Sequence, residues 1–210
     1  MKENFVKNIK KAYISPFAIF INALTLLFSA IIILDNHLLN KLPIYICVFY
    51  ILWIIINIIY LIQEKNKKYK MSKLSVVRYL IINILCGYSV SMAFASVYVF
   101  GALSQGYLVF DYWLLVIGAI FLSWLGLHIF AISEFDIANR MSGSMFNLLG
   151  IILKLISFAL LIYLSVVVPE VEDVANFIWG SIIIIICSDL LIGRSYFNYA
   201  FYLSSIEDKN

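Results

Sequence analysis

The segment Gln-Glu-Lys-Asn-Lys-Lys-Tyr-Lys-Met-Ser-Lys-Leu-Ser-Val-Val-Arg, residues 63–78, decides the fold, because it is strongly basic and lies between two long apolar runs. It carries five lysines and one arginine against a single acid, Glu64. Short loops rich in Lys and Arg beside membrane-spanning segments are retained on the cytoplasmic side. The segment therefore predicts that its flanking runs cross a membrane and that this point of the chain is cytoplasmic.

The composition indicates that lipid surrounds most of the chain. Apolar residues make up 64% of it and charged residues 13%, and its mean hydropathy is +0.99. Soluble domains are about half apolar and about a quarter charged. The net charge is only +3 and the basic residues gather at the ends of apolar runs, so we expect lipid contacts and no nucleic acid. Cys47, Cys86 and Cys187 lie inside apolar runs without metal-binding spacing, which predicts buried free thiols.

Six apolar runs are long enough to cross a bilayer as helices, since about 20 helical residues span ~30 Å. The expected spans are about 14–34, 42–63, 80–101, 112–133, 145–168 and 174–193, followed by an aromatic-rich tail from Arg194. Ser15 and Pro16 suit the cap and first turn of a helix. The first run is too long for a signal peptide, and no small-residue cleavage site follows it. The sequence predicts one all-α polytopic domain over residues 1–210.

The orientation of these spans follows from the distribution of basic residues. With segment 63–78 inside, thirteen of the fifteen Lys and Arg residues fall on the cytoplasmic side. Loops near residues 38, 106 and 171 are then external, and those near 70 and 138 are cytoplasmic. We therefore expect a multi-pass protein of the cell membrane with six transmembrane helices and both termini in the cytoplasm.

Three ionisable residues within the expected spans form the candidate polar cluster: His128, Lys154 and Asp189. A charge in the bilayer core costs about 2.5–3.5 kcal/mol on insertion scales, so it usually faces other helices and finds a partner. A short acidic loop joins the last two spans, which predicts that Lys154 pairs with Asp189. A structural pair is favoured over a proton or ion relay or a polar substrate site. The alternative partner of Asp189 is Arg194.

Small residues recur in the third and fourth spans, where they predict close approach of other helices. They are Gly87, Ser91 and Ala95 in the third span, and Gly118, Ser123 and Gly126 in the fourth.

No enzyme signature is complete in this sequence. The segment 134–140 lacks the paired glutamates of the CAAX-type membrane proteases and the downstream aspartates of the CDP-alcohol phosphotransferases. A Gly-x-Ser-x-Gly turn and a phosphate-binding loop are also absent. We therefore expect no enzymatic activity, and assign no catalytic residue, no cofactor-binding residue, no cofactor and no metal ligand.

Two functions remain open. The first is a non-enzymatic membrane protein that acts through protein contacts in the bilayer, either as an accessory subunit or as a toxin-immunity protein. The second is a small transporter or the permease subunit of an ATP-driven exporter. Since the chain has no nucleotide site, the ATPase would be another protein. The expected partners are the lipid bilayer and a membrane or cytoplasmic protein.

Overall fold

The computed structural model describes residues 2–138, 143–169 and 173–207. It is 83% helical, and its described part contains no strand. The helices are α1 (Lys2–Lys10), α2 (Ser15–Asp35), the 3-10 turn η1 (Leu39–Lys41), α3 (Ile44–Lys65), α4 (Lys73–Ala95), α5 (Tyr98–Ser104), α6 (Phe110–Glu134), α7 (Ser144–Val167) and α8 (Asn176–Glu207). The predicted loop centre at residue 171 and the end of segment 134–140 lie outside the described residues.

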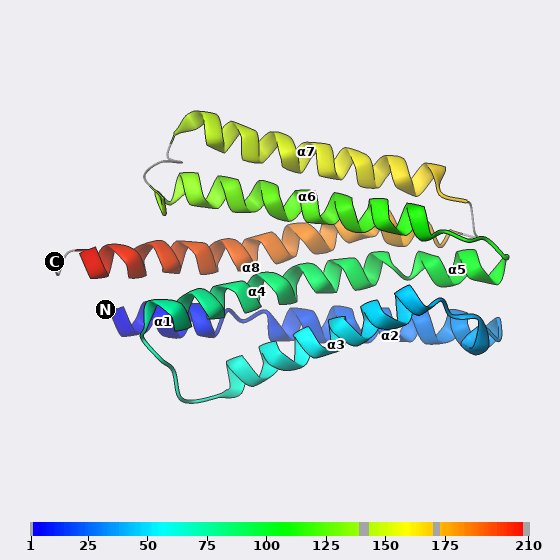
Figure 1. Cartoon of the computed structure of the whole chain (residues 1–210), viewed down its shortest axis with the longest axis horizontal. Helices are drawn as coiled ribbons and strands as arrows, with labels where there is room; N and C mark the ends of the chain where they lie inside the picture. Colours follow the sequence, from blue (N-terminus) through cyan, green and yellow to red (C-terminus); the bar gives the residue numbers. More distant parts are fainter. Residues whose placement is uncertain (1, 139–142, 170–172, 208–210) are drawn as a thin grey trace.

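Six helical segments are long and apolar enough to cross a membrane, which confirms the all-α architecture expected from the six apolar runs. Two of these segments combine two helices each, α1 with α2 and α4 with α5. The other four are the single helices α3, α6, α7 and α8. They run side by side along the long axis of the molecule (Figure 1). A helix satisfies its own backbone hydrogen bonds, which is a requirement for any segment surrounded by hydrocarbon.

Both described ends of the chain and the basic segment 63–78 lie at the same end of the bundle (Figure 1). The rings of Phe5 and Phe201 stack with their centroids 5.4 Å apart. The Tyr202 hydroxyl donates a 2.8 Å hydrogen bond to the carbonyl oxygen of Met71 in the basic segment. We call this the basic end of the bundle, and it is the end that the sequence predicts to be cytoplasmic.

The sixth helix differs from the expectation, because α8 does not give way to a tail after Gly193. It continues without interruption to Glu207, so the aromatic residues beyond Arg194 are helical. This extension packs against α1, where Asn8 Nδ2 donates a 3.2 Å hydrogen bond to Asn198 Oδ1. The extension of α8, with its aromatic residues, therefore packs the two ends of the described chain against each other.

The third span also differs, because it is divided into α4 and α5. The Ser96 hydroxyl donates to the Met92 carbonyl oxygen at 2.7 Å and accepts from Trp113 Nε1 at 2.9 Å. A serine hydroxyl bonded to the carbonyl four residues earlier is a common cause of bends in helices. At the start of α2 a smaller difference appears, since Ser15 is the first helical residue and Ile14 occupies the cap position.

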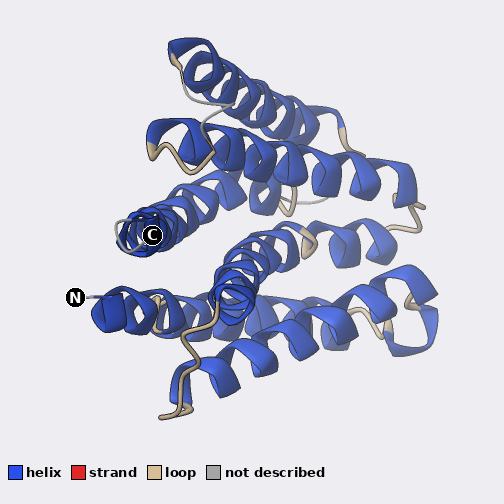
Figure 2. Cartoon of the chain, turned by 60° about the vertical axis from the view of Figure 1, so that its left-hand side comes forward, coloured by secondary structure: helices blue, strands red, loops and turns tan. Residues whose placement is uncertain are grey.

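α4 is the central helix of the bundle and packs against α1, α2, α3, α6 and α8 (Figures 1 and 2). Gly87 provides the close approach to α8 that the sequence predicts. A Cβ atom at this position would lie 2.8 Å from Ile192 Cδ1, and Ser188 Oγ donates a 3.1 Å hydrogen bond to the Gly87 carbonyl oxygen. This contact holds α8 against α4 at Ser188, the residue before Asp189.

The α6–α7 contact is closer still, because two glycines face each other across it. A Cβ atom on Gly126 would lie 2.7 Å from the Gly150 carbonyl oxygen, and one on Gly150 would lie 2.8 Å from the Gly126 carbonyl oxygen. Gly118 on the same helix has no atom within 4 Å of such a Cβ position. The small-residue face predicted for the fourth span is therefore real at Gly126 and absent at Gly118.

Candidate functional site

The ion pair that the sequence predicts is present in the bundle. Lys154 of α7 and Asp189 of α8 are in direct contact through Nζ and Oδ2, and their side chains are 21% and 11% exposed. Lys154 Nζ also donates to Ser123 Oγ of α6 at 3.1 Å. Arg194, the alternative partner of Asp189, instead places its guanidinium 5.4 Å from the centre of the Tyr13 ring. The pair therefore links the last three spans.

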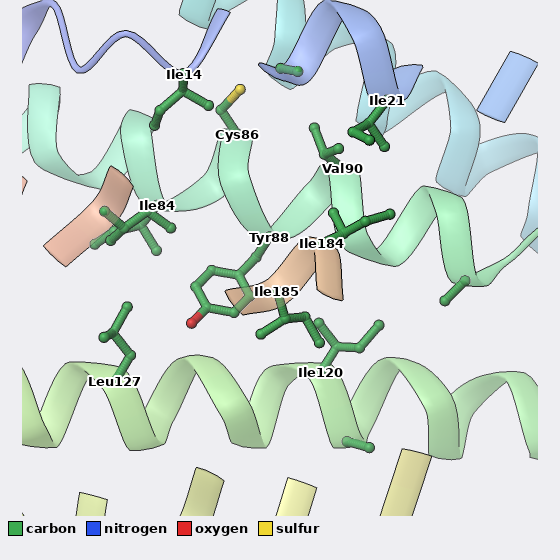
Figure 3. Close-up of a cluster of buried hydrophobic side chains, with 14 of the residues drawn as sticks. Ile14, Ile21, Ile84, Cys86, Tyr88, Val90, Ile120, Leu127, Ile184 and Ile185 are labelled. Atoms are coloured by element: carbon green, nitrogen blue, oxygen red, sulfur yellow. The ribbon is translucent and has the colours of Figure 1, made fainter. Parts of the chain in front are cut away.

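Tyr88 brings α4 into the same site. Its hydroxyl donates a hydrogen bond to Asp189 Oδ1, so both oxygens of the carboxylate have a partner. The ring is nearly buried, at 4% exposed. Figure 3 shows Tyr88 projecting from α4 towards α6, while Cys86 points to the opposite side of α4, towards Ile14. Four helices thus meet at one buried charge pair, which we call the polar cluster: Tyr88, Ser123, Lys154 and Asp189.

His128 contacts a residue outside the predicted cluster, Tyr196 of α8. Its Nδ1 lies 2.5 Å from the Tyr196 hydroxyl oxygen, and its ring stacks on Trp124 with centroids 5.6 Å apart. The structure therefore divides the three predicted residues into an ion pair and a separate histidine–tyrosine contact. The ion pair joins α7 to α8, and the histidine–tyrosine contact joins α6 to α8.

A cavity of about 400 Å³ lies beside α4, between α3 and α6. We call it the α4 cavity, and it is lined by Ile56, Ile81, Ile84, Leu85, Tyr88, Ser89, Met92, Phe121 and Trp124. Tyr88 both lines this cavity and binds Asp189, so it connects the cavity to the ion pair. Trp124 Nε1 is buried there without a hydrogen-bond partner among the described residues.

A second buried network ties α1 to the basic end of the bundle. Asn83 Nδ2 donates to the Ile9 carbonyl oxygen at 2.7 Å and to Ser195 Oγ at 3.1 Å. Gln63 Nε2 donates to Asn83 Oδ1 at 2.9 Å. Because the four residues of this network lie on four different helices, it holds α1 against α3, α4 and α8.

Sequence reasoning did not assign Tyr88 or Tyr196 to the site. A tyrosine inside an apolar run carries no signal for the direction in which its hydroxyl points, and Tyr196 falls in the expected tail. Ser123 is singled out only as a small residue, although it binds Lys154. The signal for the ion pair is the isolation of two charges in apolar runs, and hydroxyl groups lack such a signal.

The described residues contain no group of three His, Cys, Asp or Glu side chains placed to hold a metal ion. The cysteines are free thiols, of which Cys86 is buried and Cys47 and Cys187 are half-buried. A family model described as "Domain of unknown function (DUF5079)" matches residues 3–210. No curated protein and no solved structure matches the chain.

Proposed function

The chain belongs to the DUF5079 family, and we propose that it is a non-enzymatic multi-pass membrane protein that acts through protein contacts inside the bilayer. The observation that carries this proposal is the α4 cavity. It lies between α3 and α6 on the outer surface of the bundle, where Ile81 and Leu85 of α4 are about half exposed, at 48% and 47%. A transmembrane helix of another protein is the proposed occupant.

The shape and chemistry of the cavity support this occupant. At about 400 Å³ it accepts a few apolar side chains of a neighbouring helix rather than a whole helix. Helix association in lipid depends on such interdigitation and on hydrogen bonds between helices, each worth roughly 0.6–2 kcal/mol. An occupant would also contact Tyr88, whose hydroxyl binds Asp189. Binding in the cavity would therefore affect the Lys154–Asp189 pair through Tyr88.

Site-specific photo-crosslinking in intact membranes tests this proposal. A photoreactive residue in place of Leu85 or Phe121, which line the cavity, should form a protein adduct of defined mass. The matched controls are Leu155 and Ile162 on the outer face of α7, which are 62% and 55% exposed and should form lipid adducts only. Ser89→Leu, which fills the cavity, should remove the protein adduct. Lipid adducts alone at all four positions would contradict the proposal.

We further propose that the protein resides in the cell membrane with its basic end in the cytoplasm. The support is the concentration of Lys and Arg at this end, where the described termini and segment 63–78 lie together. Single cysteines at Lys70 and at Gln105, in a chain without its native cysteines, should react differently with an impermeant thiol reagent in intact cells. Labelling at Gln105 with protection at Lys70 is expected, and the reverse pattern would invert the orientation.

A second candidate function, transport, is favoured by one observation: a buried ion pair bridged by Tyr88 and Ser123 at the meeting point of four helices. Intramembrane ionisable groups of this kind often serve ion or substrate pathways. The chain would then be a small transporter or the membrane subunit of an ATP-driven exporter, with the ATPase docked at the basic end. A Lys154→Met/Asp189→Leu double variant tests this function. If the double variant folds but has lost transport activity, this function is favoured over the first.

A further inference from the structure

A hollow of about 280 Å³ lies at the basic end, where α3 ends and α4 begins. We call it the basic hollow, and it is lined by Lys10, Ile59, Ile62, Gln63, Asn66, Lys68, Arg78, Tyr79 and Ile82. It is separate from the α4 cavity, with which it shares no lining residue. Its lining has a polar side, made of cations and amides, and an apolar side that includes three isoleucines.

The three cations of the basic hollow have no acidic partner among the described residues. The ion pairs among the described residues are Lys7 with Glu3 and Lys154 with Asp189, and none of these four residues lines the hollow. Glu64, the nearest acid in the sequence, does not line the hollow. The hollow therefore gathers positive charge that the described part of the chain does not neutralise.

Lys10 is the strongest indication that an anion completes this site. The residue is only 4% exposed, and its ammonium donates to the carbonyl oxygen of Asn66. An ammonium has three hydrogens to donate. Burial of a cation without a counter-ion is unfavourable, so an anion in the hollow would stabilise Lys10 where it stands.

Of the other two cations, Arg78 lies on α4 and Lys68 lies in the loop between α3 and α4, which is held in place before any ligand binds. Asn66 Oδ1 accepts a 2.9 Å hydrogen bond from the backbone nitrogen of Lys68, and the Tyr79 hydroxyl accepts one of 3.2 Å from that of Lys70. The Arg78 guanidinium lies 5.5 Å from the centre of the Tyr79 ring. A preorganised site binds more tightly, since less side-chain and loop entropy is lost on binding.

The apolar side of the basic hollow continues into the hydrocarbon region. Ile59 and Ile62 are 45% and 62% exposed on the membrane-facing side of α3. A neighbouring hollow of about 440 Å³ shares Ile62 and Asn66 and adds Lys65. A ligand that fits both sides has an anionic head at the level of the cations and an apolar body along the isoleucines.

We infer that the basic hollow binds the phosphate headgroup of an anionic phospholipid from the leaflet at the basic end, with the acyl chains along Ile59, Ile62 and Ile82. Basic pockets between membrane helices are suited to such headgroups, and each Lys or Arg near an anionic membrane surface contributes about 1 kcal/mol to the attraction. This inference concerns a site apart from the α4 cavity and does not depend on the occupant proposed there.

Lipid binding by the purified full chain tests the inference. Native mass spectrometry and thermal unfolding in detergent are compared with added phosphatidylglycerol and with added phosphatidylcholine. The wild-type chain should retain one phosphatidylglycerol and unfold at a higher temperature in its presence. Lys68→Gln/Arg78→Gln should weaken retention on the order of tenfold, because two of the three cations of the hollow are lost.

The matched control is Lys67→Gln/Lys70→Gln, which removes the same charge from the same basic segment, 63–78, at two residues that line neither hollow. It should retain phosphatidylglycerol as the wild type does. Equal losses of phosphatidylglycerol retention in the two double variants would overturn the inference, because they would show that the lipid is attracted to the whole basic segment and not to the hollow. Equal retention of the two lipids by the wild type would overturn it without any variant. Full displacement of the lipid effect by millimolar inorganic phosphate would overturn it as well, by showing a site for a free anion.

Discussion

α4 and α7 are both apolar spans, yet they occupy opposite environments in the bundle. In the segment Lys73–Ser104, 72% of the apolar centre is buried inside the protein, against 22% in Ser144–Val167. The buried helix carries the polar and small residues Asn83, Gly87, Ser89 and Ser91. The exposed helix presents mostly leucine, isoleucine and valine to its surroundings, and its Lys154 and Ser157 face α6 and α8.

This difference shows that burial and apolarity are uncoupled when the solvent is lipid. Large apolar side chains gain little by leaving hydrocarbon, so they remain on the outside. Small and polar residues permit close approach and hydrogen bonds between helices, and they therefore mark the interior. On this view the stability of the protein resides in a few polar and close contacts around α4 and along the inner face of α7.

The largest expected effect comes from removing one partner of the Lys154–Asp189 ion pair, through which α7 contributes a charge to the interior. Lys154→Met or Asp189→Leu alone should destabilise the folded protein by about 3–5 kcal/mol, because each leaves the other charge buried without a partner. The double variant should recover most of this loss, since an apolar pair in place of a buried ion pair is often neutral. Unfolding in mixed micelles measures both. A double variant as unstable as the sum of the single variants would show that the residues are not coupled.

A smaller effect is expected from removing a hydroxyl group on α4. Tyr88→Phe deletes the donor to Asp189 Oδ1 and should cost about 1.5–3 kcal/mol, the range for a hydrogen bond to a charged group. The matched control is Tyr163→Phe on α7, where the side chain is 61% exposed and the stability should change by less than about 0.5 kcal/mol. The same unfolding titration compares them. Equal losses at the two positions would remove the distinction between the helices.

The smallest expected effect concerns the α6–α7 contact, where the exposed helix is anchored. Gly126→Ala should destabilise the fold by about 1–3 kcal/mol, because the added methyl would meet the Gly150 carbonyl oxygen and the helices must separate. Gly118→Ala introduces the same methyl where no atom lies within 4 Å and should be neutral. Thermal unfolding in detergent provides the measurement. A neutral Gly126→Ala would show that α7 can shift freely on α6.

The sequence predicts the six apolar segments and the Lys154–Asp189 pair because both depend on quantities local to the chain. Apolar length determines whether a segment can lie in lipid, and an isolated charge in such a segment requires a partner. The contact of His128 with Tyr196 was not predictable in this way, because it depends on how α6 and α8 are rotated. The depth of His128 in its span gives no information about that rotation.

The break between α4 and α5 and the length of α8 were also beyond the sequence pattern. The break involves Trp113 Nε1 from α6 at Ser96 Oγ, a contact between different helices. The extension of α8 packs against α1, so its helical state is stabilised by residues almost the whole described chain away. The α4 cavity and the basic hollow are each lined by residues from several helices, so they are properties of the assembled bundle.

The contact between α1 and α8 has a consequence for the order of events during synthesis. Asn8 and Asn198 are hydrogen-bonded across 190 positions of sequence. At about 5–20 residues per second, α1 emerges roughly 10–40 s before its partner exists. During that interval the ring of Phe5 lacks its stacking partner Phe201, and the Asn83 amide that binds the Ile9 carbonyl oxygen lacks its second acceptor, Ser195 Oγ. During synthesis α1 therefore remains without its packing partner α8, and in this interval it is accessible to the translocation machinery, to chaperones and to proteases.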